Sequence, residues 1–181
     1  MEKVLVVNGE KITVPDTLQN ALSDNSVSTA WSNGDMIKNI SFWSHYYSGY
    51  GWTNFMFDLN MITAREMYKV TKNTAAVLSY TGTPVKLPLT ITLKSGNNYI
   101  PCPYQTQVSI IDHMPTRADG SDYTYGDSLI DQNSDKMEFF NQNYGWFGTL
   151  TSSNFEPGKG YVLTVVRGGD YIFPIANATR R

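Results

Sequence analysis

The chain has 181 residues, of which 41% are hydrophobic and 17% charged, which is the balance of a folded protein and not of a disordered one. Its formal net charge of −2 leaves no excess of positive charge of the kind that nucleic-acid binding requires. No run approaches the roughly 18 consecutive apolar residues of a membrane-spanning helix, and residues 1–8 lack the apolar core of a signal peptide.

These exclusions limit where the protein works and what it binds. We expect no nucleic acid and no membrane insertion. We expect either a cytosolic or virion component, or a domain excised from a larger surface protein. The single cysteine, Cys102, cannot form a disulfide within the chain.

The first half of the chain reads as a series of short strands. Residues 5–7 and 12–14 flank an Asn-Gly turn, and the second stretch ends at a proline, which predicts two strands joined by a turn. A short helix capped by Asp16 is predicted over 16–22. The remaining features follow in order: Gly34 with Asp35, a strand at 36–38, an aromatic strand at 42–47, a turn at Gly51 into Trp52, and a hairpin of 67–70 with 76–78.

The second half repeats this order. Gly126 with Asp127, and later Gly145 with Trp146, recur 92–94 residues after their counterparts, and such a spacing indicates an internal duplication. The elements expected here are strands on either side of the turn at 96–98, a counterpart of the helix at 108–114, a strand at 128–130, an aromatic strand at 137–140, and a hairpin of 161–166 with 171–173.

Many short strands separated by turn signals predict an all-β protein. We expect two tandem, pseudo-symmetric β-sandwich-like units with minor short helices, residues 1–82 and 83–181, joined by a linker at 80–84. Trp52 and Trp146 should be buried, with Gly51 and Gly145 permitting the sharp turn that leads to each of them.

The second half also carries a resemblance. Its segments 95–100, 126–127, 144–150 and 156–161 resemble a β-rich repeat with the pattern GWN-x-I, GD, GW-x-G-x-L and EPG-x-GY. The last segment includes Pro157, Gly158, Gly160 and Tyr161. That repeat occurs in tandem in surface and secreted proteins of bacteria and algae. In the first half, Thr63–Tyr68 replaces the EPG-x-GY element. The resemblance implies a fold unit and transfers no catalytic residues.

No group of residues identifies a catalytic or metal site. The two histidines, His45 and His113, do not occupy equivalent places in the repeat, and a packed or surface position is expected for His45. Cys102 has no neighbouring basic residue to activate its thiol, and the spaced partners of a metal site are absent. We therefore expect no catalytic residues, no metal and no cofactor.

Asp35 and Asp127 recur directly after glycine, and two interpretations are open. Each carboxylate could bind a cation. Aspartate at the junction of a loop and a strand more commonly bonds its own backbone, and this structural interpretation is favoured.

The aromatic strand of the first half is the main candidate interface. Alternation divides its side chains between two faces, with Phe42, Ser44 and Tyr46 on one and Trp43, His45 and Tyr47 on the other. One aromatic face normally suffices for a core, so we expect Trp43, His45, Tyr47 and Tyr50 to form an additional platform. The corresponding strand of the second half has a more polar alternate face.

Three uses of this platform remain open: packing against the sister unit, contact with another protein subunit, and stacking on sugar rings. The favoured function is a non-enzymatic structural protein. It would be a subunit that self-associates, as a homo-oligomer, or docks on partner proteins in a virion, surface layer or protein shell, through aromatic surface and strand edges. The alternative is a carbohydrate-binding or adhesion module. An enzyme of the glycosidase type would need paired carboxylates, which no motif identifies.

Overall fold

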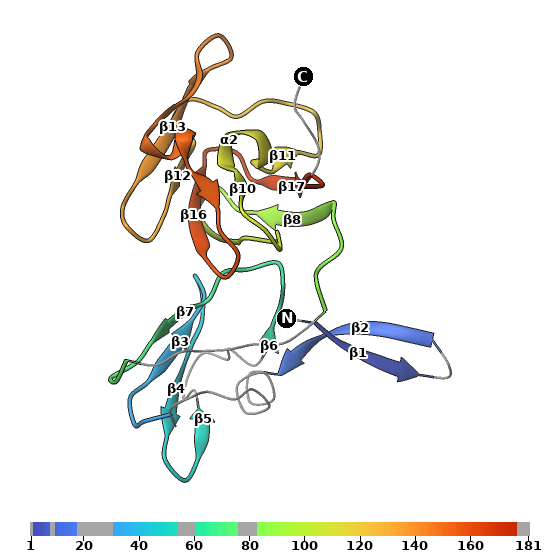
Figure 1. The fold of residues 1–181 in the computed structure, drawn as a ribbon, viewed down its shortest axis with the longest axis vertical. Coiled ribbons are helices and arrows are strands. Elements are labelled where there is room, and N and C mark those ends of the chain that lie inside the picture. The colour runs from blue at the N-terminus through green and yellow to red at the C-terminus, as the bar shows by residue number, and fades with distance from the viewer. Residues whose placement is uncertain (1, 8–9, 18–30, 54–60, 76–82, 177–181) are drawn as a thin grey trace. The chain divides into compact units, whose positions relative to one another are not determined.

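A computed structural model describes residues 2–7, 10–17, 31–53, 61–75 and 83–176. The chain divides into two compact units, residues 1–83 and 84–181 (Figure 1). Nearly all regular structure among the described residues consists of strands in antiparallel sheets, with one short α-helix. The protein is therefore all-β, as the pattern of strands and turns predicts.

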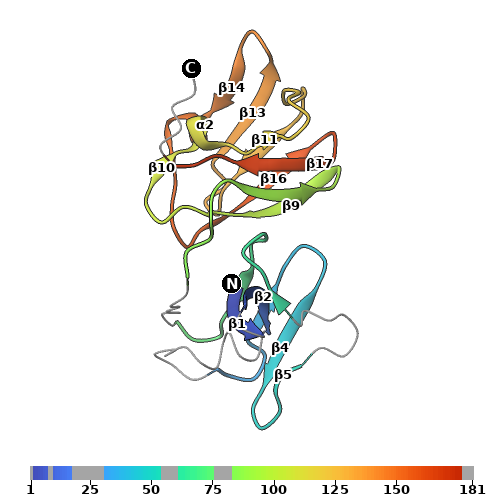
Figure 2. The same cartoon turned by 90° about the vertical axis from the view of Figure 1, so that its right-hand side faces the viewer.

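The main sheet of the second unit has five strands in the order β14-β13-β12-β16-β9 (Figure 2). The bounds are Gly145–Gly148 for β14, Lys136–Asn141 for β13, Ser128–Ile130 for β12, Gly160–Val165 for β16 and Gly96–Pro101 for β9. β16 pairs with β12 on one side and with β9 on the other. Alternate residues of β16, Tyr161, Leu163 and Val165, are buried, so this face of the sheet covers the core.

A second sheet of the same unit has the order β11-β17-β8, with bounds Thr116–Arg117, Gly169–Phe173 and Leu89–Leu93. In β8 the residues Leu89, Ile91 and Leu93 are buried, and the threonines between them are exposed. The smaller elements are β10 (Val108–Ser109), α2 (Ile110–His113), a 3₁₀ turn at Thr149–Ser152, and β15 (Asn154–Phe155), which pairs with β10.

The core of the second unit draws on both of its sheets, which makes the unit sandwich-like. Its fully buried members are Leu89, Ile91, Leu93, Ile100, Tyr104, Ile110, Met114, Leu129, Met137, Leu150, Phe155, Tyr161, Leu163, Val165, Tyr171 and Phe173. Burial of a side chain of this size stabilises the fold by about 1.5–3 kcal/mol, so this cluster supplies most of the driving force for folding of the unit.

The first unit has a four-stranded sheet in the order β5-β4-β3-β7 and a second sheet in the order β1-β2-β6. The bounds are Glu2–Val7 (β1), Glu10–Thr17 (β2), Met36–Lys38 (β3), Trp43–Tyr47 (β4), Gly51–Thr53 (β5), Met61–Ile62 (β6) and Lys69–Thr71 (β7). Its core is small. Among the described residues Ile37 and Ile62 are fully buried, and Trp31, Trp52, Tyr68 and Val70 pack against them.

The two units share one pattern of pairing. In each, the strand after the Gly-Asp pair, β3 or β12, lies between the aromatic strand and a later strand. The aromatic strand then pairs with the strand that carries the tryptophan. The order β5-β4-β3-β7 therefore corresponds to β14-β13-β12-β16, as an internal duplication requires.

The structure differs from the sequence-based prediction in the pairing of residues 161–166 with 171–173. The two stretches, β16 and β17, follow one another but belong to different sheets. The connection between them passes close to the end of β8, where a side chain at Gly168 would lie 2.8 Å from the carbonyl oxygen of Leu93. The turn therefore carries the chain from one sheet to the other and does not close a hairpin.

Two further predictions differ at the ends of elements. Asp16 does not cap a helix, because it lies in β2 and pairs with Ile62; residues 18–22 are outside the described part of the chain. Phe42, expected on the inner face of the aromatic strand, precedes β4 and is exposed. In the predicted hairpin of 67–70 with 76–78, the second strand also lies outside the described residues.

Candidate functional site

Each unit contains a buried aspartate directly after a glycine. In the second unit the Oδ2 of Asp127 accepts the backbone N–H of Thr124 at 2.7 Å, and its Oδ1 accepts that of Val166 at 2.6 Å. Gly126 permits the turn, because its φ of +94° lies in the region that favours glycine. The carboxylate therefore fastens the turn before β12 to the end of β16.

Asp35 makes the same contacts in the first unit and adds one. It accepts the backbone N–H groups of Ser32 and Asn73, each at 2.9 Å, and it binds the Nζ of Lys72 at 2.6 Å. Gly34 again has a positive φ, +87°. Burial raises the pKa of Asp35, but the hydrogen bonds from Lys72, Ser32 and Asn73 outweigh it and hold the pKa below its usual value.

These contacts give the two aspartates a structural role, which we call the carboxylate clamp. Each joins a turn to a strand distant in sequence, and its oxygens accept N–H groups from the protein. The bonded turn residue lies three positions upstream, so the contact differs from the expected bond of an aspartate to the backbone that follows it. Within the described residues, no group of three or more His, Cys, Asp or Glu side chains could hold a metal ion.

An edge-to-face group of three aromatic rings stands beside each clamp. In the first unit the Trp52 ring lies 4.8 Å from that of Trp31 and 5.6 Å from that of Tyr46. In the second, the Trp146 ring lies 4.7 Å from that of Tyr123 and 5.5 Å from that of Phe139. Both Trp52 and Trp146 are half-buried, whereas the sequence predicts burial. They cover the margin of each core.

The element that resembles EPG-x-GY has the same role in both units despite its different sequence. The Tyr161 hydroxyl accepts the backbone N–H of Glu156 at 3.0 Å, and the Tyr68 hydroxyl accepts that of Thr63 at 3.0 Å. Burial raises the pKa of Tyr161 to about 12. Gly158 lies in the turn between the two bonded residues, with a φ of +80°.

Two other residues of this element have distinct places. Pro157 is exposed beside Gly158, and Gly160 is buried as the first residue of β16, where it pairs with Pro101. The bond from tyrosine to backbone thus gives Thr63–Tyr68, which replaces the EPG-x-GY element in the first half, the same local contact as residues 156–161.

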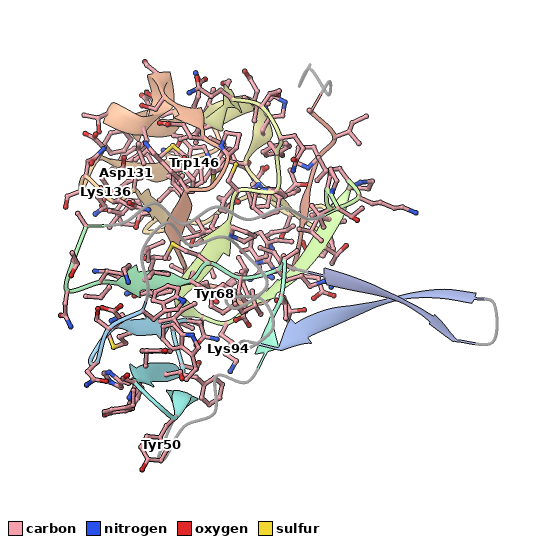
Figure 3. All side chains as sticks on the ribbon, turned by 60° about the horizontal axis from the view of Figure 1, so that its bottom comes forward. Tyr50, Tyr68, Lys94, Asp131, Lys136 and Trp146 are labelled. Atoms are coloured by element: carbon pink, nitrogen blue, oxygen red, sulfur yellow. The ribbon has the colours of Figure 1, made fainter. Side chains whose placement is uncertain are left out.

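The predicted platform of Trp43, His45, Tyr47 and Tyr50 belongs to the hairpin of β4 and β5. Ser44, between the first two, is buried, whereas Trp43, Tyr47 and Tyr50 are exposed. His45 and Tyr46, predicted on opposite faces of β4, are both half-buried. The His45 and Tyr47 rings lie 6.5 Å apart. Tyr50, which is 85% exposed, extends from the end of the hairpin away from the ribbon (Figure 3).

The second unit exposes an aromatic group that the sequence analysis does not anticipate. We call it the Phe140 cluster, and it comprises Tyr125, Phe140, Tyr144 and Phe147, which are 72%, 42%, 76% and 52% exposed. The Phe140 ring is central, with its centroid 5.8 Å from that of Tyr125, 5.6 Å from that of Tyr144 and 6.2 Å from that of Phe147.

Alternation places Phe140 on the same face of β13 as Lys136 and Glu138, and these charged residues make that face look polar in the sequence. A β-bulge lies at the same place. Phe139 pairs with Trp146 and Asn141 pairs with Gly145, so Phe140 is the extra residue and is exposed. Tyr144 precedes a glycine turn, and Tyr125 precedes Gly126. The feature of the sequence that could have indicated the cluster is a tyrosine directly before a glycine turn, which occurs on either side of the aromatic strand at Tyr125 and Tyr144.

His113 and Cys102 have structural surroundings. His113 is buried, with Nδ1 3.0 Å from the carbonyl oxygen of Ser109 and Nε2 2.8 Å from that of Ala176. It therefore ties α2 to the segment that follows β17. Cys102 is half-buried, and burial raises the pKa of its thiol, so it is a poor nucleophile.

No family model, curated protein or solved structure matches the chain. The resemblance to the tandem β-rich repeat accordingly stays a prediction. Among the residues that the structure describes, no helix is long and apolar enough to span a membrane.

Proposed function

We propose that this protein is a non-enzymatic assembly subunit, which associates with further copies of itself through the Phe140 cluster. The observation that carries the proposal is the cluster itself, four aromatic side chains in contact with one another at the surface. With about 200 Å² for each aromatic side chain, their exposed fractions correspond to roughly 500 Å² of apolar surface.

An area of this size favours an interface. The largest apolar patch on a typical monomer is about 300–600 Å² and is often functional, and a standard protein interface buries about 800 Å² per partner. The cluster would therefore form more than half of such an interface. Tyrosine and phenylalanine are also enriched at the centres of interfaces, and a charged rim is present, because Lys136 forms an ion pair with Glu138 on the same strand.

The cluster is held in place before any partner arrives. The Oδ1 of Asn141 accepts the backbone N–H groups of Asn143 at 2.9 Å and of Tyr144 at 3.1 Å, which fixes the turn that carries Tyr144. Gly148 lets β14 approach β13 so closely that a Cβ there would lie 2.3 Å from the carbonyl oxygen of Lys136. A rigid surface loses little conformational entropy on binding.

Ring geometry favours a protein partner over a sugar. The three rings around Phe140 stand at 71–80° to it, so the cluster is a knobbed surface and not one continuous stacking plane. Aliphatic and aromatic side chains of another subunit can fill the spaces between such rings. The central ring is a phenylalanine, which offers no hydrogen bond to a hydroxyl-rich ligand.

The test is sedimentation velocity over a range of concentrations for the native chain and for Phe140→Ser/Tyr144→Ser. Both sites are exposed, so the variant should fold with little loss of stability. Loss of two central aromatics should weaken association at least about 30-fold. Ile175→Ser, another exposed apolar position of the same unit, is the matched control and should associate as the native chain does.

Equal association of the double variant and the native chain would contradict the proposal. An oligosaccharide that binds the native monomer, and that the double variant fails to bind, would favour the alternative of a carbohydrate-binding module.

A further inference from the structure

Each unit exposes aromatic side chains at the same end of the same hairpin. The registers make Tyr47 and Phe140 equivalent, because each follows the residue that pairs with the tryptophan of its unit. Tyr50 and Tyr144 are likewise equivalent, since each directly precedes a turn glycine of positive φ. The exposed fractions are similar, at 38% and 85% in the first unit and 42% and 76% in the second. The platform of the first unit is therefore the counterpart of the Phe140 cluster.

Both surfaces are carried by turns that hydrogen bonds hold in place. In the first unit the backbone N–H of Tyr50 donates to the carbonyl oxygen of Tyr47 at 3.0 Å. The backbone N–H of Ser48 donates to the Oδ1 of Asn33 at 2.6 Å. Asn141 fixes the corresponding turn of the second unit. The backbone of each surface is therefore ordered before binding, which lowers the entropic cost of an interface.

The two surfaces are also comparable in area. With about 200 Å² for each aromatic side chain, the exposed fractions of Trp43, Tyr47 and Tyr50 correspond to roughly 300 Å², whereas the Phe140 cluster has roughly 500 Å². Each is as large as the largest apolar patch of a typical monomer, which is often functional. An interface between two copies of the cluster would leave the platform exposed in every copy. A contact between the platform of one copy and the cluster of the next would cover both surfaces.

The charges beside the aromatic side chains favour the second of these contacts. The pairing with β3 and β12 shows that Trp43 and His45 occupy the places of Lys136 and Glu138. When two such sheets pack with their aromatic strands aligned and equivalent residues opposed, two clusters bring like charges together at both places, which is repulsive. The platform instead brings the Trp43 ring against Lys136, a cation–π pair. It also brings the imidazole of His45, a hydrogen-bond donor, against the carboxylate of Glu138.

We infer that the platform of one copy is the surface that binds the Phe140 cluster of the next copy. This pairing rests on the proposed function, in which the cluster mediates association, and it identifies the opposite surface. Because the platform and the cluster are different surfaces, the contact is heterologous and repeats from copy to copy. Assembly therefore continues beyond a dimer, into an open chain or a closed ring.

A complementation experiment by sedimentation velocity tests this pairing. The platform variant is Tyr47→Ser/Tyr50→Ser, and the cluster variant is Phe140→Ser/Tyr144→Ser, so that serine replaces equivalent residues of the two units. Association should weaken at least about 30-fold in each, and each variant alone should sediment as a single chain at concentrations where the native chain associates. An equimolar mixture should form a complex of two chains and nothing larger, since one intact platform meets one intact cluster.

Two further variants control for effects on folding, which circular dichroism measures. Ile40→Ser, at an exposed apolar position beyond the opposite end of β4 from Tyr50, should associate as the native chain does. Tyr50→Ser alone changes a side chain that is 85% exposed, so it should keep the fold. It takes the place of the double platform variant if that variant does not fold.

Each alternative gives a different result. If the platform variant associates as the native chain does while the cluster variant stays monomeric, the cluster binds another surface, which overturns the pairing and leaves the proposed function standing. If the cluster variant associates as the native chain does, the proposed function fails and the pairing fails with it. An equimolar mixture that stays monomeric would also overturn the pairing. So would a native chain that stays monomeric while the mixture forms the complex, because the platform and the cluster of one chain would then bind each other.

Discussion

Replacement of Asp127 by asparagine tests whether the carboxylate clamp holds the second unit together. The amide oxygen can replace one carboxylate oxygen, but the amide nitrogen is a donor and must face the N–H of either Thr124 or Val166. The variant loses a hydrogen bond to a charged acceptor and leaves a buried N–H unsatisfied, at a combined cost of about 3 kcal/mol. For a unit of this size, the melting temperature should fall by roughly 12–24 °C.

The assay is thermal unfolding followed by near-ultraviolet circular dichroism, with Asp131→Asn as the matched control. The Oδ1 of Asp131 also accepts two backbone N–H groups, from Asn133 at 2.8 Å and from Asp135 at 2.9 Å, but in a solvent-exposed turn. Water can replace a lost bond there, so the control should lose less than about 1 kcal/mol. A shift for Asp127→Asn no larger than that of the control would refute the argument from burial.

Three other outcomes are expected. Because Lys72 helps to hold the pKa of Asp35 below its usual value, the stabilisation that Asp35 contributes is present above the unfolded pKa of about 3.9 and disappears as the pH falls through the lower folded pKa. The free energy of unfolding should therefore fall more steeply between pH 5 and pH 2 for the native chain than for Asp35→Asn, and parallel curves would contradict this. Tyr161→Phe leaves the N–H of Glu156 without its acceptor and should cost about 1 kcal/mol in urea unfolding, whereas an unchanged midpoint would count against the bond. Gly148→Ala places a Cβ 2.3 Å from a backbone oxygen of β13 and should cost about 3 kcal/mol or more in the same assay; a loss below about 1 kcal/mol would show that the strands separate easily.

The sequence was sufficient to predict the strand-rich fold, because strands and turns depend on local signals. The glycines before Asp35, Asp127, Trp52 and Trp146 all have a positive φ, which glycine adopts more readily than other residues. These turns could therefore be recognised from the sequence. Alternation also predicted which side of β4 is buried at Ser44.

The features that the sequence did not reveal depend on contacts between distant segments. The Phe140 cluster gathers Tyr125, Tyr144 and Phe147 from outside β13, so alternation along β13 alone did not reveal it. The separation of β16 and β17 into two sheets depends on the close approach of Gly168 to β8. The bond of Tyr68 to Thr63 became recognisable only when it was compared with that of Tyr161 to Glu156.

The two units share features of their interior and differ on their exterior. Both units have the carboxylate clamp and a tryptophan with two aromatic rings edge-to-face against it. They differ on the outer face of the aromatic strand, where the first unit presents Trp43, His45 and Tyr47 and the second presents Phe140. The two units thus combine the same strand order with different outer surfaces.

The most direct test of the assembly proposal is the molar mass of the untagged native chain, measured by light scattering from about 1 µM to about 1 mM. The proposal predicts a mass that rises with concentration above the 20.3 kDa of one chain. A constant 20.3 kDa over the whole range would contradict it.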